Sequence, residues 1–261
     1  MDLATCHAYA EELEHRLRLK TFPLAIKVLG SEESLPDGCV KPKRDLGYHM
    51  SLCQAFQISR RDGTPMALAR EDMWCPEPVI GFGLQEAPEY FMEGNNRYPR
   101  DVSTQQAGRV YAEELPKLPN GMYSAVLSAP LRSTPFEPDA ITIYCLPAQL
   151  SSLLLALEYK DGHNLNCALS SHAACVYGVV PTLQTGRAQV AIPCRGDRYS
   201  AMAEDDEMIL TVTPYELADL LPALRHLETT GSVYPKGYRM RFEYALPKAY
   251  QTMADMMGYL E

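Results

Sequence analysis

The chain has 261 residues, 46% of them hydrophobic and 22% charged, which is long enough to bury a full core. Its formal net charge of −9 argues against non-specific binding to nucleic acid, because phosphate contacts need clustered lysines and arginines. The acidic, amphipathic start does not read as a signal peptide, and no apolar run is long enough to span a bilayer. We therefore expect a cytoplasmic protein with a small-molecule partner and no membrane.

Segments of helical and strand periodicity alternate along the chain without a low-complexity linker. We expect helices over residues 3–19, 51–63, 147–162, 170–180, 214–228 and 247–260, and strands over 22–30, 122–131, 140–146, 188–194 and 207–213. A loop is expected after the first strand. This order predicts an α/β (mixed α+β) fold, a single domain over residues 1–261 with a central mixed sheet and flanking helices.

The eight cysteines contain no Cys-x-x-Cys pair, so the usual zinc-ribbon and thioredoxin signatures are absent. A reducing cytoplasm leaves them as free thiols or metal ligands, and any single cysteine is most simply a small buried hydrophobe. Four stand apart by their positions in the expected elements. Cys53 lies in the first turn of a helix, Cys75 precedes a proline, Cys175 lies in a short helix and Cys194 ends a strand. Three of these four lie at element ends, which leave backbone N–H groups free to bond sulfur, and we take all four as candidate ligands.

The same four cysteines lie in segments that resemble a known family. The segments are "FPLAIKVL", "LCQAFQISRRDG", "EDMWCPEPVIGFG", "AACVYGVVPTLQTG" and "VAIPCRGDR". Their order is similar to that in the bacterial and archaeal domain-of-unknown-function family 169, over about residues 21–221. The resemblance implies the architecture and the cysteine set Cys53, Cys75, Cys175 and Cys194, and it implies no particular reaction. Cys145 lies where other residue types are usual in that pattern.

Four scattered thiolates can bind a [4Fe-4S] cluster or a structural zinc ion. Zinc sites usually come as two Cys-x-x-Cys pairs, which this chain lacks, whereas clusters accept ligands spread across a fold. Pro76 shapes the loop beside Cys75, and Gly196 allows the backbone to approach a sulfide. The sequence favours a [4Fe-4S] cluster, with zinc and uncoordinated thiols as alternatives.

Two residues near these segments are candidate acid–base groups. Lys27 interrupts an apolar strand, where an ammonium group is costly unless it faces a cavity or a carboxylate; the alternative is an edge lysine in water. His172 precedes Cys175 by three residues, so on a helix the two would share a face. Its side chain titrates near neutrality, but a histidine near a helix start is often a cap or surface residue.

Arg195 and Arg198 flank Gly196 and are candidates to clamp a substrate carboxylate, or else to pair with Asp197. Gln54 and Trp74, the only tryptophan, are candidates to line the same pocket. The alternative for Trp74 is core packing.

Two classes of function remain open. One is an iron–sulfur enzyme, an oxidoreductase or lyase acting on a small anionic or aromatic substrate, with Lys27, His172 and Arg198 in catalysis or binding. The other is a non-catalytic carrier or sensor of a metal or cofactor. The sequence also leaves open an electron-transfer partner and a homo-oligomer.

Overall fold

Six strands form one sheet in the computed structural model, which describes residues 1–231 and 247–258. They are β1 (Leu24–Gly30), β2 (Met66–Ala69), β3 (Tyr123–Pro130), β4 (Ala140–Cys145), β5 (Gln189–Ala191) and β6 (Met208–Val212). Their order across the sheet is β2-β3-β1-β4-β6-β5, and each strand runs antiparallel to its neighbours. The predicted mixed α/β class is confirmed. The sheet is antiparallel rather than mixed, because hydrophobic periodicity identifies strands without giving their directions.

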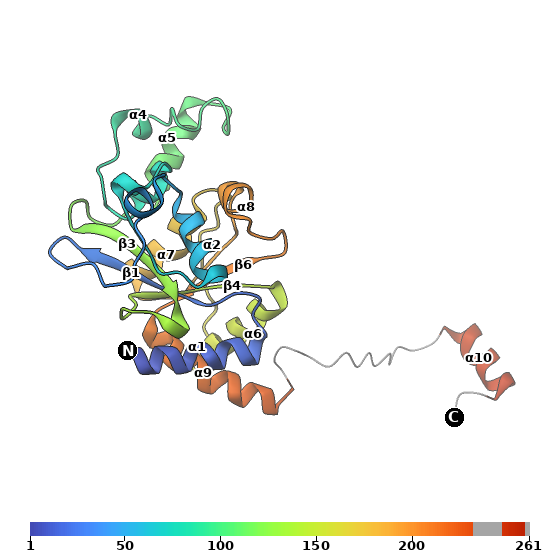
Figure 1. Cartoon of the computed structure of the whole chain (residues 1–261). Coiled ribbons are helices and arrows are strands. Elements are labelled where there is room, and N and C mark those ends of the chain that lie inside the picture. Colours follow the sequence, from blue (N-terminus) through green and yellow to red (C-terminus); the bar gives the residue numbers. More distant parts are fainter. Residues whose placement is uncertain (232–246, 259–261) are drawn as a thin grey trace.

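Helices cover both faces of this sheet (Figure 1). The helices of the described residues are α1 (Leu3–Leu17), α2 (Leu52–Asp62), α3 (Pro76–Gly81), α4 (Glu89–Met92), α5 (Gln105–Glu114), α6 (Pro147–Glu158), α7 (Ala174–Thr185), α8 (Arg195–Ala201), α9 (Pro214–Thr229) and α10 (Lys248–Met257), and not all of them lie on the sheet. A short π-helix lies at Pro42–Leu46, and short 3-10 helices lie at Arg70–Asp72 and Leu131–Ser133. Within the described residues, no helix is long and apolar enough to cross a membrane.

The sheet separates two hydrophobic cores. One face packs against α1, α6 and α9, and the other packs against α2, α3 and α7 (Figure 1). Side chains alternate along each strand, so neighbours in β1 enter different cores. Ile26 and Val28 enter the core that contains α2 and α7, whereas Ala25 and Leu29 enter the core that contains α1.

The predicted helices begin where local capping signals stand. Ser51 and Gln54 form a reciprocal capping box at the start of α2, and Thr213 and Glu216 form another at the start of α9. Asp2 caps α1 by accepting a hydrogen bond of 2.8 Å from the Thr5 N–H.

Several short elements are absent from the sequence-based prediction. The structure adds β2, α3, α4, α5 and α8, and the segment "RGDR" is the start of α8. The helix expected over 170–180 begins only at Ala174, because Ala173 adopts a left-handed backbone with φ of 48°. The predicted C-terminal helix is present as α10, and residues 259–260 of that prediction lie outside the described residues.

Candidate functional site

The four candidate cysteines all stand at the starts of helices. Cys53 is the second residue of α2 and Cys175 the second residue of α7, while Cys75 and Cys194 are the N-caps of α3 and α8. Helix N-termini present unpaired N–H groups and a partial positive charge, which favour thiolates. Each of the four cysteines thus stands in the same kind of environment, a helix N-terminus. We call Cys53, Cys75, Cys175 and Cys194 the four-cysteine site.

The four cysteines interact with one another on one face of the sheet. The Cys53 thiol hydrogen-bonds with Cys175 and Cys194, and Cys75 interacts electrostatically with Cys175. Cys53, Cys175 and Cys194 belong to the core that contains α2 and α7, and Cys75 is partly exposed at its edge. Sequence positions more than 140 residues apart therefore meet at one place.

Backbone contacts bring the segments of Cys53 and Cys75 together. The Met50 N–H donates to the Asp72 carbonyl at 2.9 Å, and the Trp74 N–H donates to the Met50 carbonyl at 3.3 Å. A glycine brings α3 against α7, because a Cβ at Gly81 would stand 2.6 Å from Cγ1 of Val176. The absence of a side chain there lets Cys75 approach Cys175.

The pKa values of these thiols are shifted in opposite directions. The hydrogen bond from Cys53 lowers the pKa of Cys194 to about 5, with support from the N–H groups of Ala174, Asp197 and Gly196. The same contacts, to Cys175 and Cys194, together with burial, raise the pKa of Cys53 well above its ordinary value. Burial and the Glu77 carboxylate raise the pKa of Cys75. One thiolate is thus stabilised among thiols that retain their protons.

A buried polar network supports the Cys194 side of the site. Burial and the charge of Cys194 raise the pKa of Asp197 to about 7, and the Tyr144 hydroxyl donates to its Oδ2 at 3.1 Å. The Arg60 guanidinium lies 3.9 Å from the centre of the Tyr144 ring and binds Glu207 through two hydrogen bonds of 2.6 and 2.9 Å. Arg60 and Glu207 are both fully buried.

A second network supports the Cys75 side. The Cys75 thiol donates to Oε2 of Glu77 at 3.2 Å, and Arg97 donates to Oε1 of the same carboxylate at 2.6 Å. Arg97 also donates to Asp101 at 2.9 Å and to the Tyr111 hydroxyl at 2.8 Å. Two arginine–carboxylate pairs thus flank the four-cysteine site.

The sequence analysis missed both networks, although weak signals exist. Arg60 follows Cys53 by seven residues, two helical turns, so it shares that face of α2. Glu77 is an acidic residue in the first turn after Pro76, where a helix N-terminus favours a carboxylate. No local signal identifies Arg97 or Tyr144, because their roles depend on contacts far along the chain.

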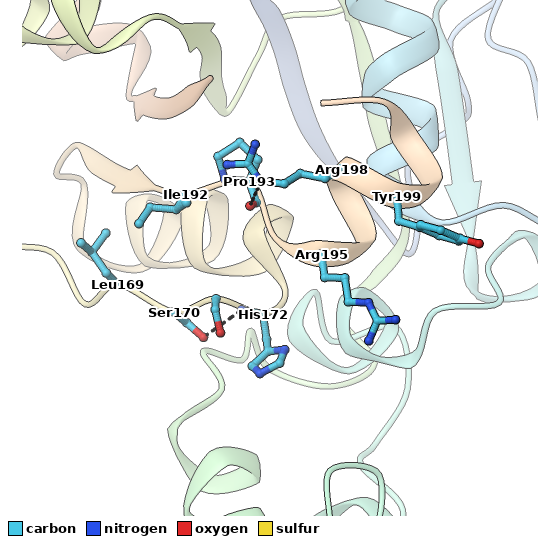
Figure 2. Close-up of a pocket in the computed structure, with 9 residues that line it drawn as sticks. Leu169, Ser170, His172, Ile192, Pro193, Arg195, Arg198 and Tyr199 are labelled. Atoms are coloured by element: carbon cyan, nitrogen blue, oxygen red, sulfur yellow. Dashed lines mark hydrogen bonds between the residues drawn. The ribbon is translucent and has the colours of Figure 1, made fainter. Parts of the chain in front are cut away.

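The structure places His172 near the site, but not on a shared helix face with Cys175. It precedes α7, its ring meets the Tyr111 ring edge-on at 5.4 Å, and it interacts electrostatically with Cys194. Burial and the Arg97 cation lower its pKa. His172 also lines a cavity of about 730 Å³ next to Cys194, shown in Figure 2.

Lys27 is not brought to the four-cysteine site. Lys27 lies two residues from both Ala25 and Leu29 in β1, so its side chain leaves the sheet on the same face as theirs. That face is opposite the one that carries the cysteines. There its Nζ pairs with Glu33 at 3.1 Å. This carboxylate offsets the cost of placing a lysine within an apolar strand.

Arg198 lies at the cavity but uses its guanidinium for the local backbone. It donates to the carbonyls of Pro193 at 3.2 Å and Glu204 at 2.5 Å. Asp197 does not pair with it, and the carboxylate that faces Arg198 is Asp205, at 3.5 Å. Arg198 therefore holds the loops around α8 together.

Gln54 and Trp74 lie near Cys75 rather than in that cavity. The Trp74 indole N–H donates to Oε1 of Gln54 at 3.3 Å, and Trp74 lines a second cavity of about 400 Å³ that includes Cys75. The tryptophan side chain is 53% exposed, so the alternative of core packing is wrong.

The remaining cysteines serve the packing of the fold. Cys6, Cys39 and Cys145 belong to the core around α1, α6 and α9, and the Cys167 sulfur accepts the Val190 N–H at 3.2 Å. All eight cysteines are free thiols. Within the described residues, no group of three or more histidine, cysteine, aspartate or glutamate side chains is arranged so that it could hold a metal ion.

Fold and site together define a mixed α/β protein with a buried group of four thiols at helix N-termini. The sequence model of domain-of-unknown-function family 169 (DUF169), described as an uncharacterised ArCR family, matches residues 12–222, and the chain belongs to this family. An uncharacterized protein of Methanocaldococcus jannaschii is 22% identical over 229 residues, which cover 87% of this chain and 96% of that protein. No solved structure matches the chain.

Proposed function

We propose that Cys53, Cys75, Cys175 and Cys194 bind a [4Fe-4S] cluster in a cytoplasmic protein. The observation that carries this proposal is the meeting of four thiols from four helix N-termini, with one of them poised as a thiolate. Free cysteines suit a reducing compartment, where such thiols persist as ligands.

The chemistry of the donor set fits a cluster. Four soft thiolate donors select iron–sulfur clusters or zinc over hard cations. Three backbone N–H groups aim at the Cys194 sulfur, and such bonds tune the potential of a bound cluster. A Cβ at Gly196 would stand 3.7 Å from that sulfur, which is an ordinary contact, so the structure does not require glycine at this position. When bound by all four cysteines, the cluster would supply electron transfer; Lewis-acid chemistry would require one of the four cysteines to leave its iron open.

The cavity beside Cys194 favours an enzyme over a carrier. It reaches the backbone on both sides of that cysteine, and His172 on its wall is placed to hold or move a proton. We propose an oxidoreductase or lyase that acts on a small anionic or aromatic substrate. The contacts of Lys27 and Arg198 described above leave His172 as the acid–base candidate. If every iron carries a cysteine ligand, an electron-transfer partner or a sensor role is favoured instead.

Structural zinc is the second candidate, because one tetrahedral ion also takes four cysteine thiolates. Its sulfurs would stand ~3.8 Å apart for a Zn–S bond of about 2.3 Å. A cluster separates its cysteine sulfurs further, because the iron–sulfide cube lies between them.

Anaerobic purification with iron, sulfide and zinc analysis tests the proposal. We expect about four irons and four sulfides per chain, with a visible absorption band. Cys194→Ser should lose iron and the band. Cys145→Ser is the matched control, because Cys145 is equally buried but lies in the opposite core, and it should keep both. One zinc ion per chain without visible absorption would refute the cluster and support the zinc site. Protein free of both iron and zinc would refute the cluster and the zinc site alike.

A further inference from the structure

The cavity beside Cys194 has two chemically different ends. Figure 2 shows Leu169 and Ile192 on one side and the side chains of His172 and Arg195 on another. Its volume of about 730 Å³ lies within the range of small-molecule sites. An apolar end and a cationic end in one cavity suit a ligand that has an apolar body and an anionic group.

Arg195 is the cation available to such a ligand. Its side chain is exposed at the start of α8 and lines the cavity, and among the described residues it has no hydrogen-bond or ion-pair partner. Arg198 differs, because its donors are taken by the carbonyls of Pro193 and Glu204. In a chain of net charge −9, an uncompensated arginine at a cavity next to a buried centre is a specific attractor for an anion.

We propose that this cavity binds a small aromatic or branched carboxylic acid, with its carboxylate on Arg195 and its apolar body against Leu169 and Ile192. A guanidinium pairs with a carboxylate through two parallel N–H···O bonds, and the His172 ring lines the same end of the cavity as a further donor. A phosphate ester fits less well, because the cavity offers one free guanidinium and a largely apolar remainder. This inference rests on the proposed function, since it names the class of substrate that would reach the four-cysteine site.

Calorimetric titration of the full chain with benzoate, phenylacetate and isovalerate tests the binding, with benzamide as the neutral isostere of benzoate. We expect saturable binding of at least one acid and much weaker binding of benzamide. Arg195→Gln should weaken the acid by about tenfold or more, because it removes a charge-assisted pair, and Arg195→Lys should restore part of it. The control Arg187→Gln removes an exposed arginine outside this cavity and should change nothing.

The inference is overturned if no acid binds saturably, or if Arg195→Gln binds the acid as tightly as the unaltered chain. Metal analysis of the same preparation separates this result from the proposed function. Arginine-dependent binding by protein that contains neither iron nor zinc would refute the proposed centre and keep the carboxylate site. A loaded centre without acid binding would refute only the carboxylate site.

Discussion

Replacing Arg60 by methionine should remove a large part of the stability of the fold. The Arg60 and Glu207 side chains are 1% and 3% exposed and share two hydrogen bonds. Methionine fills a similar volume but leaves the Glu207 carboxylate buried without a counter-charge. Breaking a buried pair from one side costs about 3–5 kcal/mol, against a total of roughly 5–15 kcal/mol for a typical domain.

The double variant Arg60→Met/Glu207→Gln isolates the charge as the cause. Glutamine keeps an oxygen that accepts the Glu204 N–H, a bond of 2.8 Å in the structure, but carries no charge. It should recover about 2 kcal/mol or more of the loss, because the remaining buried group is neutral. Lys160→Met is the surface control: its pair with Asp219 at 2.8 Å is exposed, so its loss should cost less than about 1 kcal/mol.

Urea unfolding followed by circular dichroism measures these differences, with the metal content held equal among the variants. A loss of less than about 1 kcal/mol for Arg60→Met would refute the reasoning. So would a double variant no more stable than the single one. Either result would mean that water or a rearranged partner reaches Glu207 in the variant.

Three further outcomes follow from the site. In metal-free protein, thiolate absorbance should appear as pH rises through about 5, because contacts in the folded chain lower the pKa of Cys194; Cys53→Ala, which removes the donor, should move this step upward, and a step only near pH 8 or 9 would contradict the assignment. Trp74, the only tryptophan and half-exposed, should emit as a solvent-accessible indole, and iron loading beside it should quench the emission; an emission insensitive to added quencher would argue against its exposure. Gly81→Ala should cost about 1–3 kcal/mol through its clash with Val176, and Val176→Ala should relieve part of that cost when the two are combined; thermal unfolding compares them, and additive losses would exclude the clash.

Much of the fold follows from periodicity and end signals in the sequence. The strands β1, β3, β4 and β5, all expected in the central sheet, lie in it. The missed helices are short, and their formation depends on neighbours: α3 has six residues and packs through Gly81 against α7. No window of local sequence contains that contact, because Gly81 and Val176 are far apart in the chain.

The candidate site was predictable for residues whose surroundings follow from their local position in the sequence. A cysteine at the end of an element implies free N–H groups around it; the sequence placed three of the four there, and in the structure all four stand at helix starts and interact with one another. The partners of charged side chains were not predictable in this way. Lys27 and Arg198 looked available because the sequence does not show Glu33 beside one or the carbonyls of Pro193 and Glu204 beside the other.

The two flanking networks make the four-cysteine site asymmetric, and this asymmetry bears on how it would take up a metal. Cys194 receives N–H donors and loses its proton easily, whereas the Cys75 thiol donates to Glu77 and keeps its proton. Metal ligation requires thiolates and releases protons. In the proposed centre Cys194 would therefore bind first, and Cys53 and Cys75 would release their protons as they join. Arg97 also donates to Glu77, so the carboxylate that accepts the hydrogen bond of the Cys75 thiol is itself held in place.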